Sequence, residues 1–421
     1  MVKMKVFKFG GASVKDAEGV KNLAQVLTTT GEKDLVVVIS AMGKMTNAFE
    51  QVVTNYFDTK SEVPSALNEI VHFHHTILKE LFTSEKHPVF LKVNQLITEL
   101  SQLLDKNKSK QHPFVYDQVV PYGELISTCI VSAYLLEIGI ENTLLDARDC
   151  IITDTKYRDA NIQWEETQQR ISEVVKKKGI TVTQGFIASE NTHNFTTTLG
   201  REGSDYTAAI FGYCLNADTV TIWKDVPGVL NADPRYFNKT TLLHHISYKE
   251  AIELAFYGAS VIHPKTLQPL QRKEIPLHVK SFYNPTAAGT CVGKGVPLDP
   301  LISCFILKTN QVLISLSSLD FSFMMENHIG DVFRWLHEYK MKVELIQNSA
   351  ISFTVCVDNK YDTLAPLLSK LRATFKVKWN EGVTLYTIRH ASPNEIKKLE
   401  ANKTVLVKQE NRDTVQLVVK A

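Results

Sequence analysis

The five residues from Leu35 to Ile39 read Leu-Val-Val-Val-Ile, without a polar interruption. A strand with one face in water would alternate apolar and polar residues, so this run predicts a strand covered on both faces, as in a parallel sheet between helices. Another strand is expected from Lys5 to Phe9, and apolar residues at helical spacing predict a helix from Val14 to Leu27. Strand, helix and buried strand in this order open a layered α/β domain.

The same α/β pattern continues to about residue 295. Residues 44–110 are largely helical in pattern, and the segment after 283 is rich in glycine and proline, which is typical of a boundary. Further helices are expected at 125–136 and 163–178, and further strands at 142–145, 180–183, 219–223 and 275–282.

Beyond residue 300 a βαββαβ order of elements runs once and then restarts. The second copy stops at Ala421, before its second helix and last strand, so Ile302 to Leu307 are expected to fold back and supply the missing strand. The sequence predicts two parts, residues 1–295 and residues 300–421. In the second part the repeats are residues 308–380 and residues 381–421 with 301–307.

Composition excludes several classes of protein. The 421 residues carry 47 basic and 45 acidic side chains, a net charge of +2 that gives no general attraction to nucleic acid or to acidic membranes. The six cysteines include no C-x-x-C pair and fit free thiols in a reducing compartment. No apolar run approaches the roughly 20 residues of a membrane span, and no signal peptide is evident. A cytoplasmic enzyme or binding protein, without membrane or nucleic-acid partners, is therefore expected.

A lysine and two glycines follow the first expected strand, as Lys8-Phe9-Gly10-Gly11. Glycines after a strand let backbone N–H groups approach an anion, and the next helix presents its N-terminus to the same place. Lys8 adds a positive charge, so the segment suits a phosphate group. The alternative is an ordinary turn with an exposed lysine, because the chain has neither G-x-x-x-x-G-K-[ST] nor G-x-G-x-x-G.

A second polar loop, Thr-Thr-Thr-Leu-Gly-Arg-Glu-Gly-Ser-Asp, runs from Thr196 to Asp205 and leads into an expected helix. Asp205 alone fits a plain N-cap. Arg201, Ser204 and Asp205 beside two glycines are denser than capping requires, so a binding loop is favoured.

Other candidates are weaker. The histidines at 72, 74 and 75 lie in an expected helix without H-E-x-x-H spacing and are interpreted as a helix surface; the pair at 244–245 is equally unsupported as a metal site. The loops Ser40–Thr46, Pro121–Glu124 and Ile222–Arg235 are polar but unspecific when taken one at a time.

Four motifs together are far more specific: KFGGASV, TTTLGREGSDYTAA, WKDVPGVLNADPR and YGASVIHPKTLQP. In this order and spacing they closely resemble the aspartate kinases of the amino-acid kinase family. The likeness covers roughly residues 3–295, and the tail resembles the paired ACT regulatory domains of that family. It implies a three-layer α/β/α kinase domain, ferredoxin-like ACT domains and a homodimer formed through them. No homoserine dehydrogenase domain follows, which implies the monofunctional form.

The resemblance also implies roles for individual residues. Lys8 would contact the transferring phosphoryl group, and Asp205 would hold Lys8 in place. Arg201 would bind the α-carboxylate of aspartate, and Glu124 its ammonium group. The other implied site residues are Gly10, Gly11, Ser13, Lys224, Asp225, Asp233, Arg235 and Ser260 for ATP, and Ser40, Thr46 and Ser204 for aspartate. Mg²⁺ would accompany ATP, and no protein side chain is implied as a metal ligand.

Three residues depart from the family pattern. Glu202 stands where the family has glycine, and a carboxylate there would repel aspartate unless it points away. Ser260 stands where the family has lysine, and Lys224 where it has threonine. We hypothesise that an ATP-facing cation lost at 260 is regained at 224.

In the tail, the resemblance implies that an amino-acid effector, lysine or threonine, binds where the first ACT strand turns into its helix. The residues implied are Met324, Met325, His328, Ile329, Val343, Glu344, Asn348 and Ser349. Glu344 replaces the usual aspartate, and Asn327 replaces a glycine. The alternative is a dimerisation module with weak or no effector binding.

The chemistry fits this assignment. The β-carboxylate of aspartate, with a pKa of about 4, is already a nucleophile at pH 7. The reaction needs neutralised repulsion and in-line positioning more than it needs a base. The predicted function is ATP-dependent phosphorylation of L-aspartate to 4-phospho-L-aspartate, at the entry to lysine, threonine and methionine synthesis. Two alternatives stay open: a kinase for glutamate or a nucleotide, and a catalytically weak amino-acid sensor.

Overall fold

The computed structural model describes residues 4–176, 178–259, 262–295, 297–320, 322–401 and 403–420. The chain divides into two compact units. The first comprises Met1–Val229, Leu242–Ile252 and Val261–Pro297, and the second comprises Leu230–Thr241, Glu253–Ser260 and Leu298–Ala421. The domain boundaries expected from the sequence stay predictions.

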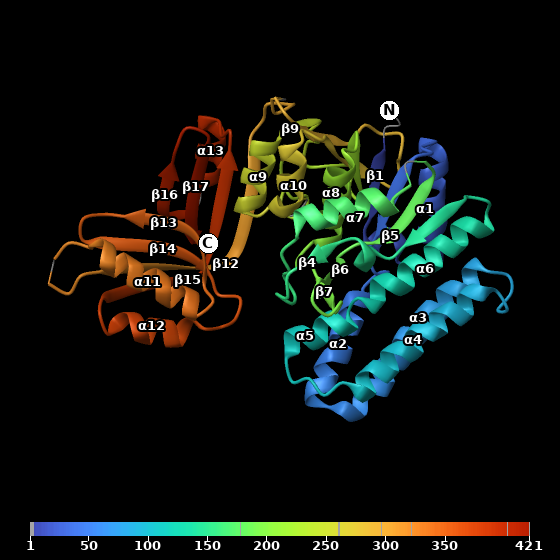
Figure 1. Ribbon diagram of the computed structural model, residues 1–421. Helices are drawn as coiled ribbons and strands as arrows, with labels where there is room; N and C mark the ends of the chain where they lie inside the picture. The colour runs from blue at the N-terminus through green and yellow to red at the C-terminus, as the bar shows by residue number, and fades with distance from the viewer. Residues whose placement is uncertain are drawn as a thin grey trace. The chain divides into compact units, whose positions relative to one another are not determined.

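An eight-stranded sheet forms the centre of the first unit (Figure 1). Its strands, in spatial order, are β3 (Asn142–Leu145), β5 (Ile180–Gln184), β2 (Leu35–Ile39), β1 (Lys5–Phe9), β8 (Thr219–Lys224), β10 (Leu277–Ser281), β11 (Thr290–Gly293) and β9 (His245–Ser247). The six strands from β3 to β10 are parallel, and β11 pairs antiparallel with β10. Every residue of β2 is buried, so the expectation of a strand covered on both faces is confirmed. The strands β9 and β11 were not predicted.

The first unit also contains helices, of which some pack directly on this sheet. The helices are α1 (Ala17–Thr30), α2 (Met45–Asp58), α3 (Val63–Leu81), α4 (Pro88–Lys106), α5 (His112–Val119), α6 (Tyr122–Glu137), α7 (Trp164–Val174), α8 (Gly203–Leu215) and α10 (Pro264–Arg272), with 3₁₀ turns at Gly11–Val14, Lys60–Glu62 and Ala147–Asp149. Helix α8 packs on β1, β2 and β8, whereas α6 packs on β2, β3 and β5. Local chemistry sets the ends of α1: the Asp16 carboxylate accepts the N–H of Gly19 at 2.8 Å, and Gly31 closes the helix at φ 65°.

The helical region predicted for residues 44–110 contains α2, α3 and α4, and α3 and α4 lie side by side as a hairpin (Figure 1). The interpretation of all three histidines of α3 as surface residues was wrong. His74 is fully buried, and its Nδ1 lies 2.8 Å from the carbonyl oxygen of Ile70. It occupies the apolar face of an amphipathic helix that the sequence spacing of the histidines did not reveal.

A small sheet completes the first unit. Its strands are β4 (Ile152–Thr153), β6 (Ile187–Glu190) and β7 (Thr196–Thr198). These short strands were not predicted, because they break the apolar alternation that identifies strands. All three threonines of β7 are buried.

The stretch His112–Glu137 is long and apolar enough to cross a membrane by composition, which the sequence analysis did not anticipate. Its most apolar window is 78% buried inside the protein, which is typical of a core helix. Residues of both α5 and α6 contribute to that core.

The second unit is built on one six-stranded antiparallel sheet. Its strands, in spatial order, are β13 (Lys342–Asn348), β14 (Ser352–Asp358), β12 (Cys304–Ser317), β15 (Lys376–Arg389), β17 (Thr414–Lys420) and β16 (Thr404–Glu410), and its helices are α11 (Glu326–Glu338), α12 (Leu364–Arg372) and α13 (Pro393–Glu400). Helix α9 (Tyr248–Tyr257) crosses the division between the two units.

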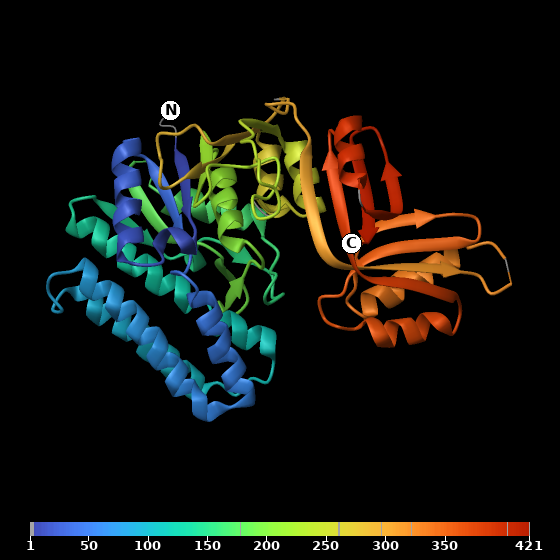
Figure 2. The ribbon, with the colours of Figure 1, turned by 180° about the vertical axis from the view of Figure 1, so that it is seen from behind.

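Two long strands join the repeats in this sheet (Figure 2). In β12, residues 304–308 pair with residues 385–389 of β15, and residues 313–317 pair with residues 376–380 of the same strand. The predicted return of Ile302–Leu307 to the second repeat is confirmed over residues 304–307. A single strand, β15, runs from Lys376 to Arg389 and so continues from one expected repeat into the other.

Apolar side chains form three clusters in this unit. One packs beneath α11 and α12 and contains Val332, Leu336 and Leu367, and another lies beside α13 around Leu417. The third joins Leu313 of the first repeat to Leu385 and Val418 of the second. The repeats therefore share a core as well as strands.

Candidate active site

The carboxyl ends of β1, β2, β5 and β8 meet at one edge of the large sheet, because these four strands are parallel neighbours. Phe9, the last residue of β1, is in register with Ile39 and with Trp223. Ligands of open α/β sheets bind at this kind of edge. Gly10, Gly11, Ser13, Ser40 and Asp225 lie on the loops that follow these strands, and Lys8 and Lys224 lie within β1 and β8 themselves.

Two lysines flank one buried carboxylate at this edge. The Nζ of Lys8 lies 2.5 Å from Oδ1 of Asp205, and the Nζ of Lys224 lies 3.5 Å from Oδ2. Burial disfavours the charged form of Asp205, but the two ammonium groups outweigh it and hold the pKa of this carboxyl below its usual value. With one carboxylate between two cations, the cluster keeps a net positive charge for an anionic ligand.

Glycine is required where the loop after β1 meets the loop after β2. A Cβ on Gly11 would lie 2.8 Å from the carbonyl oxygens of both Ala41 and Gly43, closer than any side chain tolerates. The N–H of Gly43 donates to the carbonyl oxygen of Gly11 at 3.0 Å. A Cβ on Gly10 would lie 3.3 Å from the Nζ of Lys8. These glycines leave the space beside the lysine open to a ligand.

Glu124 lies in the first turn of α6 and is 2% exposed. Its Oε1 accepts the N–H of Ala41 at 3.2 Å, and its Oε2 has no hydrogen-bond partner within the described part of the chain. Burial raises the pKa of Glu124 to about 8. This carboxyl is therefore mostly neutral at pH 7 until a cation comes next to it.

The loop before α8 carries Arg201, which is exposed, and the first turn of α8 carries Ser204, which is buried. Glu202 adopts φ 55°, a left-handed conformation that glycine takes at no steric cost. Its Oε2 is buried and finds no hydrogen-bond partner among the residues that the structure describes. The departure from the family pattern at 202 therefore combines backbone strain with an unsatisfied carboxylate oxygen.

The remaining predicted residues of the first unit are near the same edge. The N–H of Ser40 donates to the carbonyl oxygen of Phe9 at 3.1 Å, and the Oγ of Ser13 donates to that of Trp223 at 3.4 Å. Thr46 lies in the first turn of α2, and Asp225 is exposed directly after β8.

Two other predicted ATP residues lie in the second unit. They are Asp233 and Arg235, and the Arg235 guanidinium binds both carboxylate oxygens of Asp233. Ser260 lies outside the described residues.

The predicted effector residues lie in the second unit. Met324 and Ile329 belong to the core beneath α11, and Met325 is 52% exposed. Glu344 is nearly buried and forms ion pairs with Lys308 and, at 2.9 Å, with Lys342. The Oγ of Ser349 lies 2.7 Å from that of Ser352. Glu344 is therefore already paired within its sheet.

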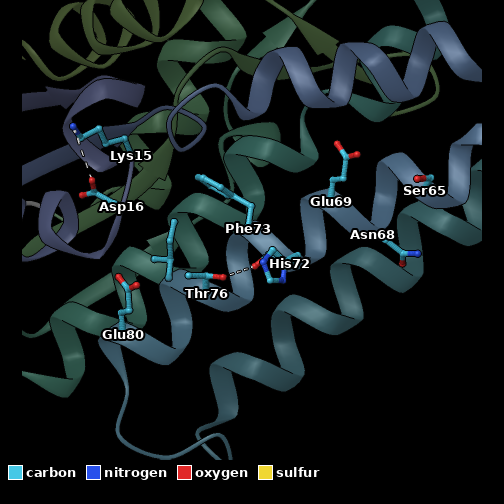
Figure 3. A pocket seen from close by; sticks show the side chains of 10 residues that line it. Lys15, Asp16, Ser65, Asn68, Glu69, His72, Phe73, Thr76 and Glu80 are labelled. Carbon is cyan, nitrogen blue, oxygen red and sulfur yellow. Dashed lines mark hydrogen bonds and ion pairs between the residues drawn. The ribbon is translucent and has the colours of Figure 1, made fainter.

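A groove of about 540 Å³ lies on another part of the first unit (Figure 3). One face of α3 and the two residues before α1 line it; the side chains are Lys15, Asp16, Ser65, Asn68, Glu69, His72, Phe73, Thr76, Ile77 and Glu80. It contains none of the predicted catalytic residues. A Cβ on Gly43 would lie 3.5 Å from the ring of Phe73, so the groove backs onto the loop that follows β2.

Asp117 of α5 is a fully buried carboxylate that was not predicted as a site residue. It binds the segment that leads to Arg201. A charged residue between Val115 and Val120, in a stretch that is otherwise mostly apolar or aromatic, is the signal that identifies it.

The chain is similar in sequence to proteins of a known family. A family model described as the amino acid kinase family matches residues 3–281. Lysine-sensitive aspartokinase 3 of Escherichia coli (strain K12) is 32% identical over 404 residues, which cover 92% of this chain and 87% of that protein. Aspartokinase 1, chloroplastic, of Arabidopsis thaliana is 32% identical over 369 residues, but these cover only 63% of that longer protein.

Solved structures give the same likeness. Aspartokinase III of E. coli in complex with lysine and aspartate (T-state) aligns with a TM-score of 0.84 at 29% identity, covering 99% of this chain and 96% of that one. The same enzyme with aspartate and ADP (R-state) aligns with a TM-score of 0.82 at 28% identity, with the same coverage of both chains. These similarities agree with the three-layer kinase fold and the C-terminal ACT fold expected from the sequence.

Proposed function

Since this chain belongs to the amino acid kinase family, and within it to the aspartokinases, we propose a division of labour among its residues. The protein is an ATP-dependent kinase that phosphorylates the β-carboxylate of L-aspartate to 4-phospho-L-aspartate, the first step of the aspartate pathway to lysine, threonine and methionine. The observation that carries the assignment of roles is the Lys8–Asp205–Lys224 cluster at the same sheet edge as Glu124.

In the reaction, a β-carboxylate oxygen of aspartate attacks the γ-phosphorus of ATP. A new P–O bond forms, the bond from that phosphorus to the β,γ-bridging oxygen breaks, and ADP leaves with the bonding electron pair. No proton has to be removed from the nucleophile at pH 7. The protein has to hold two anions together in line and stabilise the charge on the transferring group.

We propose that the lysine cluster serves the phosphoryl side. Lys8 contacts the transferring group, Asp205 fixes the position of Lys8, and the N–H groups of Gly10 and Gly11 receive phosphate oxygens, with Ser13 beside them. Support comes from the 2.5 Å ion pair between Lys8 and Asp205 and from the space that Gly10 leaves next to the lysine.

We propose that Glu124 and Arg201 serve the amino-acid side. Glu124 receives the ammonium group and Arg201 the α-carboxylate, and Ser40, Thr46 and Ser204 complete the pocket. The support for Glu124 is the unsatisfied state of its Oε2 among the described residues together with its raised pKa, because a carboxyl in this state gains most from a cationic ligand.

Mg²⁺ is proposed to enter as MgATP. Among residues 4–176, 178–259, 262–295, 297–320, 322–401 and 403–420 no group of three or more His, Cys, Asp or Glu side chains is arranged to hold a metal ion. The ion would then be bound mainly by the phosphates of the nucleotide. Lys224 and Asp225, with Asp233, Arg235 and Ser260, stay proposals for the rest of the ATP site.

We also propose an amino-acid effector, lysine or threonine, at the turn before α11, and a homodimer formed by the second unit. Support for the dimer is a set of large apolar side chains exposed on α11, on the segment before it and near the β13–β14 turn: Leu319, Phe323, Met325, Phe333, Ile346 and Ile351. A cytoplasmic location is proposed because no disulfide joins any two cysteines in the described part of the chain.

Trapping of the acyl phosphate tests the function. Purified protein with MgATP, L-aspartate and hydroxylamine should form aspartyl hydroxamate, and L-glutamate should give little. Binding of both substrates without any hydroxamate would favour the amino-acid sensor instead.

A further inference from the structure

Asp117 of α5 is a buried carboxylate that joins two separate segments of the chain. It is fully buried and accepts three hydrogen bonds. The N–H and the Oγ1 of Thr198 donate to it at 2.9 and 2.8 Å, and the N–H of Arg158 donates at 2.9 Å. Among the described residues, no charged side chain forms an ion pair with Asp117. Its carboxylate oxygens therefore bind only the segments that contain Thr198 and Arg158.

The first segment leads directly to Arg201, the residue proposed to bind the α-carboxylate of the substrate. Thr198 is the last residue of β7, and Leu199 and Gly200 are all that separate it from Arg201. The N–H of Leu199 donates to the carbonyl oxygen of Phe186 at 2.9 Å. Asp117 thus binds the end of the strand from which the Arg201 loop begins.

The second segment supports the same loop from another side. The N–H of Ala160 donates to the carbonyl oxygen of Thr198 at 3.0 Å. A Cβ on Gly200 would lie 2.8 Å from Oδ1 of Asp159 and 3.2 Å from the carbonyl oxygen of Arg158, so these residues contact Gly200 closely.

The backbone of Arg158 has a strained conformation in which its N–H donates to Asp117. It adopts φ 70°, a left-handed conformation that is unfavourable for a residue with a side chain. In this conformation its N–H reaches Asp117, and its guanidinium lies 4.1 Å from the centre of the Tyr116 ring. Strain of this kind persists only where the surroundings determine it, and it is frequent near functional sites.

We propose that Asp117 is a positioning residue that fixes Arg201 for recognition of the α-carboxylate of the amino-acid substrate. This inference rests on the proposed function, since it concerns the substrate side of the same site. Asp117 touches neither substrate. It acts by holding β7 and the Arg158–Asp159 segment together beneath the loop.

Replacement of Asp117 by asparagine tests the proposal. The Asp117→Asn change keeps the size of the side chain but removes its charge and replaces one acceptor oxygen with an NH₂ group. At the Oδ2 position this group would face two backbone N–H donors, and at the Oδ1 position it would force the Thr198 hydroxyl to accept instead of donate. We expect the KM for L-aspartate to rise at least tenfold at pH 8, while the KM for ATP changes less than twofold and kcat less than threefold. An unchanged KM for aspartate in folded Asp117→Asn protein would overturn the proposal, as would an equal rise in both KM values.

Glu190 provides a matched control. It ends β6 in the same small sheet, is fully buried, and accepts N–H groups of Thr192, His193 and Phe195 at 2.5, 2.8 and 3.2 Å. It binds the far turn of the β6–β7 hairpin and not the end that leads to Arg201. Glu190→Gln should leave the KM for aspartate within twofold. A rise equal to that of Asp117→Asn would mean that any damage to this sheet weakens binding, and the specific role would be refuted.

A double-mutant cycle shows whether Asp117 acts through Arg201. In an Arg201→Ala background, Asp117→Asn should raise the KM for aspartate less than twofold further. A full additional tenfold rise would place the effect of Asp117 elsewhere. If the wild-type protein forms no hydroxamate at all, the proposed function fails; a wild-type enzyme with additive variants refutes only the role of Asp117.

The pH profile gives a second signature. The groups that face Asp117 are Arg158 and Tyr157 of the 154–161 segment and, on its own helix, Tyr116, whose OH donates to Glu50. Burial raises the pKa of Asp117 to about 6. The difference in KM between wild type and Asp117→Asn should therefore shrink below pH 6, where the wild-type carboxyl is also neutral.

Thr198 keeps the proposal testable if Asp117→Asn does not fold. Thr198→Val removes only the hydroxyl bond to Asp117, and Thr198→Ser retains it. Valine should raise the KM for aspartate about threefold, and serine should not. Equal KM values in the two variants would overturn the proposal.

Discussion

The two sides of the active site treat a buried carboxyl group in opposite ways. On the side proposed to bind the phosphoryl group, Asp205 lies between Lys8 and Lys224, and its pKa is lowered. On the amino-acid side, Glu124 is as deeply buried, but it accepts a hydrogen bond from the backbone N–H of Ala41, and its pKa is raised to about 8. Burial is common to both sites, so the difference comes from the neighbouring charges.

This difference matches the ligands. A polyphosphate meets a side whose positive charge is already organised, which reduces the reorganisation needed in the reaction. An ammonium group meets a carboxyl that becomes charged when the ligand arrives. Under the proposed roles, the first side is charged before the nucleotide binds, whereas Glu124 on the second side loses its proton when the ammonium group of the substrate binds.

Removal of a cation from the phosphoryl side should have the largest effect. We expect Lys8→Ala to lower kcat by roughly 10³-fold, the scale found when one preorganised donor to a developing charge is lost. The hydroxamate assay measures this. Lys5→Ala is the control, because Lys5 lies on the same strand but pairs with Glu32 at 2.5 Å, at the other end. Comparable activity in the two variants would contradict the role of Lys8.

On the amino-acid side, Glu124→Gln should raise the KM for aspartate by about 30-fold, since a hydrogen bond between charged groups contributes about 2 kcal/mol. The KM for ATP should stay nearly constant. Glutamine can keep the bond from the N–H of Ala41 at 3.2 Å, so the loop should remain in place. An equal rise in the KM for aspartate and the KM for ATP would contradict the proposal that Glu124 binds only the amino acid.

Proton release gives a direct measure of the same distinction. The folded pKa of Glu124 is raised, so at pH 7 the free enzyme holds a proton that the ammonium group of aspartate should displace. Aspartate affinity should therefore increase with pH up to about 8 and level off above it. Titration calorimetry in buffers of different ionisation enthalpy should detect nearly one proton released at pH 7 by the wild type and none by Glu124→Gln.

A smaller effect is expected at the second cation. Lys224→Thr should raise the KM for ATP about fivefold, because Lys8 remains beside Asp205 after the change. Addition of Ser260→Lys should restore part of the loss. If the two substitutions show no interaction in a double-mutant cycle, the relocation of a cation from 260 to 224 is refuted.

His74 tests burial without a charge partner and should have the least effect on activity. Burial lowers the pKa of His74 to about 4, so the folded state favours the neutral ring. Above pH 6.5 the ring is neutral in both the folded and the unfolded state, so the shift has no effect on stability. As the pH falls towards 4, the unfolded state takes up a proton that the folded state excludes, and the free energy of unfolding falls, by about 2 kcal/mol at pH 5. Chemical denaturation of wild type and His74→Gln should show a flatter pH dependence for the variant. Parallel curves would exclude His74 as the source.

The sequence predicts the sheet of the first unit better than the rest of the fold. Leu35 to Ile39 are apolar throughout and identify their strand unambiguously, whereas β7, which is Thr-Thr-Thr, does not. Lys8 and Asp205 lie in motifs that stand out in the sequence, whereas Glu124 lies in an unspecific loop and was proposed only from the family resemblance. Asp117 lies in no such motif: the sequence shows only an acidic residue in a mostly apolar stretch, and its role depends on partners, mostly backbone groups, whose positions depend on the tertiary fold.

The shared strands β12 and β15 constrain how the gene can be shortened. Residues 304–308 precede the first repeat but pair with the second, and β15 serves both repeats without a break. A stop codon after the first repeat would leave residues 304–308 without a neighbouring strand and would open the core around Leu385 and Val418. Chimaeras that exchange this tail between relatives should therefore join before Cys304, because the two repeats can be transplanted only as a single piece.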